Sequence, residues 1–173
     1  EQKLASLPGV RQVEGRLAAS VRQAGAGENA PELKLVSISS GGQALPLLSA
    51  GQLPLVSGLK HVPAQKEIVV GEGFFKAHGL QLGDDLALVM RGQTETFASS
   101  GSGITPENIY MVKDLADMLP DPAMYDAAFL EYETMARLLG QESSANEFML
   151  QLEPEVDFAL LQPQIEELLK PYG

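Results

Sequence analysis

One stretch of the sequence limits the fold more than any other. Residues 73–88 read as a short helix, a glycine stop, a tight turn and a strand. Gly79 follows two phenylalanines at the position where a helix end favours a positive φ angle, which glycine adopts at little cost. Gly83-Asp84 supplies the turn, and the apolar residues from Leu86 to Met90 alternate as in a strand. The pattern predicts a packing unit and contains no reactive constellation.

Size and composition indicate a globular chain. Its 173 residues are 45% hydrophobic and 20% charged, which suits one domain or two small lobes. The longest apolar run, Leu86–Met90, is far shorter than the ~20 residues that a membrane span needs. Glu1 opens inside what reads as a helix, and no initiator Met precedes it, so we expect a processed or trimmed part of something larger. Cysteine is absent, which excludes disulfides, thiolate catalysis and Cys-ligated zinc.

Charge is distributed unevenly. Residues 1–104 carry nine acidic and nine basic side chains, whereas residues 105–173 carry fourteen acidic and three basic ones, which gives the whole net charge of −11. Such a chain repels nucleic acid and anionic lipid headgroups, so we expect no nucleic-acid partner. The acidic half is either a solvated surface that maintains solubility or a docking surface for a basic partner.

Alternation and breaker residues predict the elements. Strands are expected over 10–21, 33–39, 67–70, 86–90, 94–98, 109–112, 126–130 and 146–152. Helices are expected at the start, over 114–119 and 131–139, and from Phe158 onward, with Asp157 as cap and Pro163 as a kink. Residues 40–64 combine recurrent Gly and Pro with many leucines, which predicts an ordered, winding connection at the boundary between two lobes.

The side chains that could carry chemistry lack the partners that such chemistry needs. His61 and His78 have no partner at metal-ligand spacing, and Gly101-Ser102-Gly103 lacks the following helix and nearby Lys of a phosphate loop. The carboxylate pairs read as turn, helix-start or solvated residues, since acid–base work needs one desolvated partner; they are Asp84/Asp85, Glu131/Glu133, Glu153/Glu155 and Glu166/Glu167. We therefore predict no catalytic, cofactor-binding or metal-binding residue, no cofactor, and no enzymatic activity.

The order of several short pieces resembles the extracytoplasmic domain of MacB-like and FtsX-like ABC transporter permeases. The pieces are Leu4-Ala5-Ser6-Leu7-Pro8-Gly9-Val10 with Val13-Glu14 and Arg16; Gly51-Gln52-Leu53-Pro54; Glu67-Ile68-Val69-Val70; Phe75-x-x-His78-Gly79-Leu80-x-x-Gly83-Asp84; Phe97-x-x-x-Gly101 leading to Pro106 and Ile109-Tyr110; and Leu169-Lys170-Pro171-Tyr172-Gly173. They span nearly the whole chain, and their order and spacing carry the resemblance more than any single piece.

The resemblance implies an α+β fold in which a porter-like β-α-β repeat lobe holds an inserted β-rich second lobe. The expected division is 1–39 with 127–173 for the porter-like lobe and 40–126 for the inserted one. It also implies a domain exposed to the periplasm or cell exterior and anchored to the cell membrane by transmembrane helices of the same permease. A cytoplasmic ATPase and a homodimeric or paired permease would complete the transporter, and the domain would transmit motion and contact substrate or an accessory protein.

The sequence also allows two other interpretations of the function. Gly79-Leu80-x-x-Gly83-Asp84 before a strand also recurs in small β-barrel modules of oxidoreductase or decarboxylase enzymes, and a free-standing binding domain would suit the composition equally. The resemblance also has a departure, because apolar residues are expected where Ser99-Ser100 stands. The second strand of that hairpin is therefore expected to end early.

Overall fold

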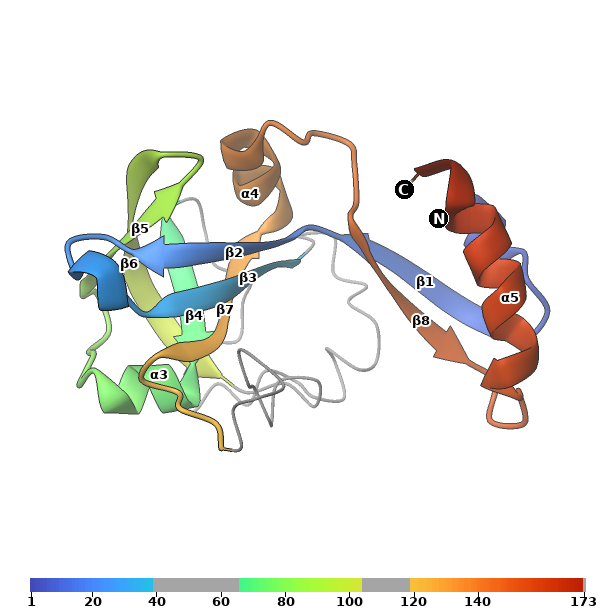
Figure 1. The fold of residues 1–173 in the computed structure, drawn as a ribbon, viewed down its shortest axis with the longest axis horizontal. Coiled ribbons are helices and arrows are strands. Elements are labelled where there is room, and N and C mark those ends of the chain that lie inside the picture. Colours follow the sequence, from blue (N-terminus) through green and yellow to red (C-terminus); the bar gives the residue numbers. More distant parts are fainter. Residues whose placement is uncertain (39–65, 104–118, 173) are drawn as a thin grey trace.

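A computed structural model describes residues 1–38, 66–103 and 119–172. These residues form an elongated molecule with a strand-rich part at one end and a smaller helix-and-hairpin part at the other (Figure 1). The predicted α+β class is confirmed. The expected connection over 40–64, the strand over 109–112 and the helix over 114–119 (apart from Leu119) lie outside the described residues.

The strand-rich part is a closed six-stranded barrel with the strand order β2-β3-β7-β4-β6-β5. Its strands are β2 (Ala18–Gln23), β3 (Glu32–Ile38), β4 (Glu67–Gly71), β5 (Asp85–Met90), β6 (Gln93–Gly103) and β7 (Tyr125–Glu131). The β3–β7 and β4–β6 pairs are parallel, and the remaining pairs are antiparallel. Only two residue pairs, Arg22↔Val89 and Gln23↔Leu88, join β2 to β5 and close the barrel.

Two apolar clusters occupy opposite faces of the same strands. Alternate residues of all six strands fill the barrel core, with Leu35, Val70 and Ala128 each fully buried. The intervening residues form a second cluster on the other face of β3, β4 and β7: Val36, Ile38, Val69, Ala127 and Phe129. The buried residues of these three strands therefore lie on both faces, which explains the unbroken apolar runs Ile68-Val69-Val70 in β4 and Ala127–Leu130 in β7.

Two short helices follow directly from barrel strands. Helix α3 (Glu72–Ala77) continues from β4, and α4 (Tyr132–Leu139) continues from β7. They lie at opposite ends of the barrel (Figure 1). The predicted glycine stop is confirmed, because Gly79 has a φ angle of 60° just after α3. The turn that follows leads into β5 and β6, as the pattern of residues 73–88 predicts.

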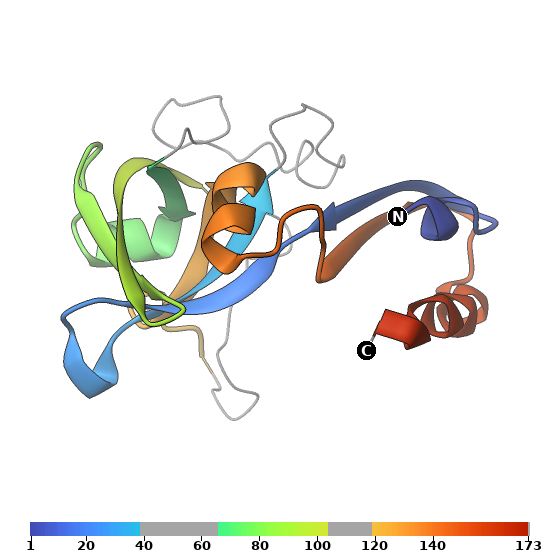
Figure 2. The ribbon, with the colours of Figure 1, turned by 90° about the horizontal axis from the view of Figure 1, so that it is seen from above.

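The smaller part, which we call the terminal lobe, contains both ends of the described chain (Figures 1 and 2). It consists of α1 (Gln2–Ala5), β1 (Val10–Arg16), β8 (Glu147–Leu152), α5 (Phe158–Leu169) and a final 3-10 turn (Lys170–Tyr172). Strands β1 and β8 pair antiparallel as a separate two-stranded sheet. The helix cap on α5 is confirmed, since the Asp157 carboxylate accepts a hydrogen bond from Ala159 N at 3.0 Å.

Three expectations differ from the structure. The strand over 10–21 is divided at Leu17 into β1 and β2, which belong to different sheets. Strand β6 does not end at Ser99-Ser100 but runs to Gly103, because small buried residues fit this position beside β4. The expected porter-like lobe, 1–39 with 127–173, includes β2, β3 and most of β7 together with the chain termini. In the structure these three strands pair with β4, β5 and β6, since their apolar side chains share the barrel core.

Candidate functional site

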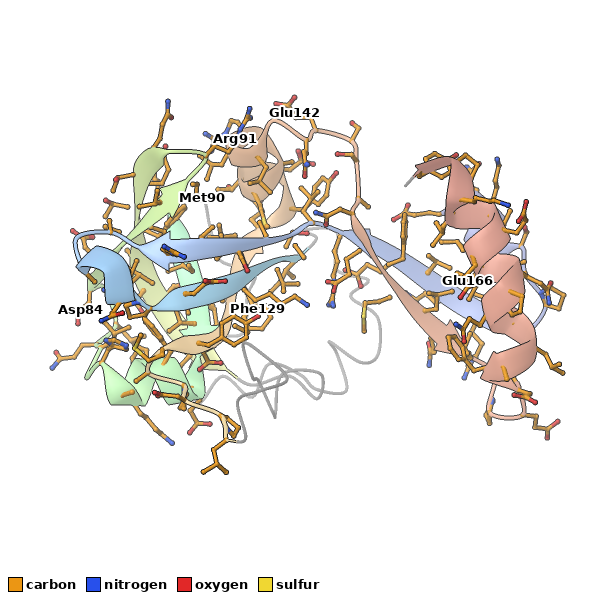
Figure 3. All side chains as sticks on the ribbon, in the orientation of Figure 1. Asp84, Met90, Arg91, Phe129, Glu142 and Glu166 are labelled. Carbon is orange, nitrogen blue, oxygen red and sulfur yellow. The ribbon has the colours of Figure 1, made fainter. Side chains whose placement is uncertain are left out.

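Two of the paired carboxylates, Asp84 and Glu131, have structural contacts in the fold. Asp84 accepts a hydrogen bond from Gln81 N at 2.8 Å and orders the turn after α3. Glu131 accepts one from Thr134 Oγ1 at 2.9 Å at the start of α4. Figure 3 places Asp84 at the barrel and Glu166 on α5, so these two pairs lie at opposite ends of the molecule. The structure does not bring the candidates together.

The other candidates are the two histidines and the Gly101-Ser102-Gly103 segment. His78 Nε2 lies 2.9 Å from Ala123 O, and its ring contacts Phe74 with the ring centroids 4.1 Å apart. Gly101-Ser102-Gly103 is part of strand β6 and not a loop. His61 lies outside the described residues. Among the residues that the structure describes, no group of three or more His, Asp or Glu side chains is placed to hold a metal ion.

Asp126 is a buried carboxylate that the sequence analysis did not single out. Its Oδ2 accepts a hydrogen bond from Phe74 N at 2.8 Å, and its Oδ1 accepts one from Ala127 N at 2.8 Å. Burial raises the pKa of Asp126, and the two backbone hydrogen bonds oppose this shift without cancelling it. A Cβ atom on Gly71 would lie 2.2 Å from the carboxyl carbon, so glycine is required for this close approach. Asp126 therefore joins β7 to the start of α3.

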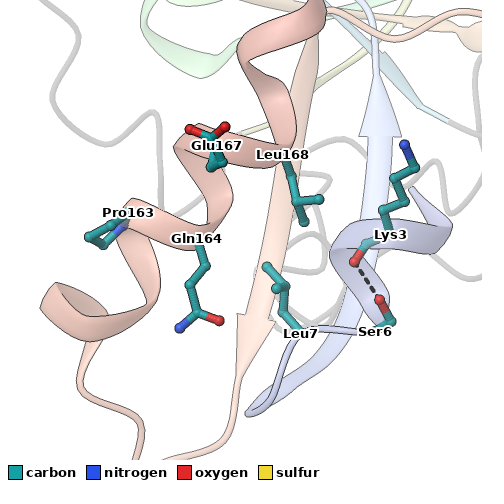
Figure 4. Close-up of a pocket in the computed structure, with 7 residues that line it drawn as sticks. All are labelled: Lys3, Ser6, Leu7, Pro163, Gln164, Glu167 and Leu168. Atoms are coloured by element: carbon teal, nitrogen blue, oxygen red, sulfur yellow. Dashed lines mark hydrogen bonds between the residues drawn. The ribbon is translucent and has the colours of Figure 1, made fainter.

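The terminal lobe is hollowed on two sides of α1. A cavity of about 480 Å³ lies between α1 and α5, where Leu7 and Leu168 face each other between more polar side chains (Figure 4). A larger cavity of about 840 Å³ opens toward the α4–β8 connection and includes Gly15, Tyr132 and Phe148 in its lining. Lys3 and Leu168 line both cavities, so the two are adjacent. Their linings offer mainly a mixed surface of leucine, tyrosine and serine side chains.

Three polar side chains at this larger cavity have hydrogen-bond partners within the chain. Tyr132 donates its hydroxyl proton to Ser144 O at 2.7 Å, and Ser144 donates its own to Gln141 O at 2.6 Å. The Glu1 carboxylate accepts a hydrogen bond from Gly15 N at 2.6 Å. These contacts stabilise the wall of the cavity and do not form an arrangement of acid, base and nucleophile.

A denser polar cluster lies where the barrel meets the terminal lobe. We call it the interlobe junction: residues 16–18, Asn146 and Glu147, with Lys34 and Ser37 of β3. Arg16 Nε lies 2.7 Å from Glu147 Oε2, and Lys34 Nζ lies 3.0 Å from Glu147 Oε1. Burial acts to raise the pKa of Glu147, but the hydrogen bond from Lys34 and the charges of Arg16 and Lys34 outweigh it, so the pKa is lowered.

Comparisons with known proteins identify solved structures that are similar to this chain. No protein-family model matches the chain, and neither does any curated protein sequence. The chain is similar to the crystal structure of the periplasmic region of MacB from Actinobacillus actinomycetemcomitans, with a TM-score of 0.51 and 13% sequence identity over 99% of this chain and 71% of that one. It also matches the extracellular domain of the noncanonic ABC-type transporter YknZ from Gram-positive bacteria, with a TM-score of 0.47 and 14% identity over 89% of this chain and 71% of that one.

The first of these matches covers both the barrel and the terminal lobe, since almost the whole chain is aligned. No helix within the described parts of the chain is long and apolar enough to cross a membrane. The alignment and the α+β architecture confirm the expected resemblance at the level of the fold. The chain has the fold of the periplasmic region of the transporter protein MacB.

Proposed function

We propose that this chain is the extracytoplasmic domain of an ABC transporter permease. The observation that carries the proposal is the fold shared with the MacB periplasmic region along 99% of the chain. Fold alone does not fix function, because one fold hosts many functions, so the proposal is an analogy at the level of fold. The structural contacts of Asp84 and Glu131 favour a module without chemistry of its own.

The terminal lobe supports the proposed position in the parent protein. Both ends of the described chain lie in this lobe, as a domain inserted between two transmembrane helices would require (Figure 2). We propose that the chain faces the periplasm or cell exterior, that the parent is a homodimeric or paired permease, and that a cytoplasmic ATPase drives it. The terminal lobe would be the porter-like part and the barrel the β-rich part.

The proposed action is mechanical and non-enzymatic. Motion that begins at the membrane would enter through the terminal lobe and reach the barrel, whose surface would contact the substrate or an accessory protein. The double-sided burial of β3, β4 and β7 supports this role, since a closely packed barrel moves as one body.

Topology of the parent permease is the direct test. The chain contains no cysteine, so a Thr94→Cys variant of the full-length parent, with any other cysteines replaced, places one thiol on an exposed barrel position. We expect a membrane-impermeant maleimide to label it in intact spheroplasts. A cysteine in the cytoplasmic ATPase, as control, should be labelled only after lysis. Labelling of Thr94→Cys only after lysis, or a parent gene without apolar segments of ~20 residues on either side, would refute the proposal.

A further inference from the structure

The described chain passes between its two parts at two places, and both meet at the interlobe junction. Strand β1 continues into β2 through the single residue Leu17, and the connection after α4 returns to β8 through Asn146. Figure 1 shows the two passages side by side at the centre of the molecule, and main-chain hydrogen bonding between Asn146 N and Arg16 O at 3.1 Å confirms their proximity. A junction this narrow is where a hinge would form if nothing held it.

The first passage is fixed to the barrel by one serine. Ser37 N donates to Leu17 O at 2.8 Å, and Leu17 N donates to Ser37 Oγ at 2.8 Å. Ser37 is buried, and the Leu17 side chain is fully buried in the barrel core. The backbone at Leu17 therefore has both of its polar groups occupied, and its rotation would break two buried hydrogen bonds.

The second passage is fixed to the first by an asparagine side chain. Asn146 Oδ1 accepts from Ala18 N at 2.7 Å, and Asn146 Nδ2 donates to Ala18 O at 2.8 Å. This side-chain amide gives Ala18 the two hydrogen bonds that a neighbouring antiparallel strand residue would give. It thereby extends the β1–β8 pairing across the boundary into β2.

Glu147 completes the junction by contacting both parts at once. Its carboxylate binds Arg16 of β1, whose side chain is 2% exposed, and Lys34 of β3, whose side chain is 31% exposed. Strand β3 lies in the barrel, whereas Arg16 and Glu147 are the last register pair of the terminal sheet. A change in the angle between the two parts would separate Lys34 from Glu147.

We infer that the interlobe junction is a latch that fixes the barrel and the terminal lobe at one angle, with Asn146 and Glu147 as the residues that position one part on the other. The two parts then move as a single rigid lever. This rigidity is a property of the chain alone, while its use in transport rests on the proposed function. The two can therefore fail separately.

Distance measurement between the two parts tests the latch. The absence of cysteine allows spin labels at two exposed positions, Thr94→Cys in the barrel and Ala159→Cys in α5. We expect one narrow distance peak for the otherwise unaltered chain. The double variant Asn146→Ala/Glu147→Gln should broaden that peak about twofold, because more than one interlobe angle becomes populated.

Two further variants complete the design. Glu153→Gln removes the exposed ion pair with Arg11 inside the terminal lobe and should leave the peak width unchanged, as a matched control. Lys34→Met removes only the bridge to β3 and should broaden the peak even if the double variant fails to fold. An unchanged width in a folded double variant, or in Lys34→Met when the double variant does not fold, would overturn the inference.

Discussion

Asp126 offers the sharpest test of how the barrel is stabilised. Replacing it with alanine removes the acceptor of two backbone N–H groups, those of Phe74 and Ala127. Both residues are buried, at 0% and 1% exposure, so water cannot readily replace the carboxylate. Each unsatisfied buried donor costs about 1–3 kcal/mol, so the two together give a loss of about 2–6 kcal/mol in the free energy of unfolding. A domain of this size has about 5–15 kcal/mol in total, so the variant should be near the limit of folding.

Urea unfolding followed by circular dichroism measures this loss. Asp84→Ala is the matched control, because Asp84 is exposed and accepts a single backbone hydrogen bond at 2.8 Å from Gln81 N. Its cost should stay below about 1 kcal/mol. If Asp126→Ala costs no more than Asp84→Ala, with an unchanged denaturant slope, the carboxylate does not hold the start of α3 and the reasoning is wrong.

The pH dependence of the same variant gives a second readout. Burial raises the pKa of Asp126 above its value in the unfolded chain. The group's contribution to stability is then complete below the unfolded pKa and is lost as pH rises through the folded pKa. The difference in unfolding free energy between the unaltered chain and Asp126→Ala should therefore grow as pH is lowered from neutral. A difference that shrinks on acidification would contradict the assigned direction of the shift.

Three other substitutions test separate parts of the structure. Glu147→Gln should lower the free energy of unfolding in urea by about 1.5–3 kcal/mol at neutral pH, because charge-assisted hydrogen bonds are lost. The folded pKa of Glu147 is lowered, so this loss should vanish as pH falls through that folded pKa, and a pH-independent loss would count against the ion pairs. Phe129→Ala should lower the free energy of unfolding, measured in urea, by about 3–5 kcal/mol, since the ring is fully buried in the second apolar cluster (Figure 3). Leu82→Ala is the control, because Leu82 is 53% exposed and its loss should be small. Gly79→Ala should lower the free energy of unfolding by about 1 kcal/mol, and with it the thermal midpoint, because φ is 60° at this position. No atom lies within 4 Å of the added Cβ, so the loss would come from the backbone alone. An unchanged midpoint would mean that the end of the helix relaxes.

Local features of the fold could be predicted from the sequence because short-range rules determine them. The glycine at position 79 and the alternation after it determine a helix end and a strand without distant partners. Asp157 likewise has its N-cap contact two residues away. Such elements depend on residues that are adjacent in the chain, and they were placed correctly.

Features that depend on long-range pairing could not be predicted in this way. The apolar residues Val13, Leu17, Ala19 and Val21 favour one strand over residues 10–21, and no breaker stands at Leu17 itself. Nothing at that position shows that β1 and β2 join different sheets. The polar pair Ser99-Ser100 suggests a strand end, but Ser100 Oγ donates to Ile68 O at 3.3 Å across the parallel pairing with β4. The contact that satisfies the hydroxyl group comes from a residue 32 positions away.

Asp126 was missed for a related reason. In the sequence it reads as a polar residue at the start of a strand, and its burial depends on the close approach of Gly71 from β4. The same holds for the interlobe junction, where Arg16, Lys34 and Glu147 are separated by more than a hundred positions at their widest. For Asp126 the useful signal would be the glycine at position 71, and it can be recognised only once the strand order is known.

The pairing of Arg16 with Glu147 has a consequence for how the chain can be rearranged. These two residues end the terminal sheet opposite each other, so a tight turn joining them would convert β1 and β8 into an ordinary hairpin. Everything between them is then a cassette that can be excised or exchanged while both chain ends keep their positions. An evolving protein could replace the barrel in this way without rebuilding the terminal lobe.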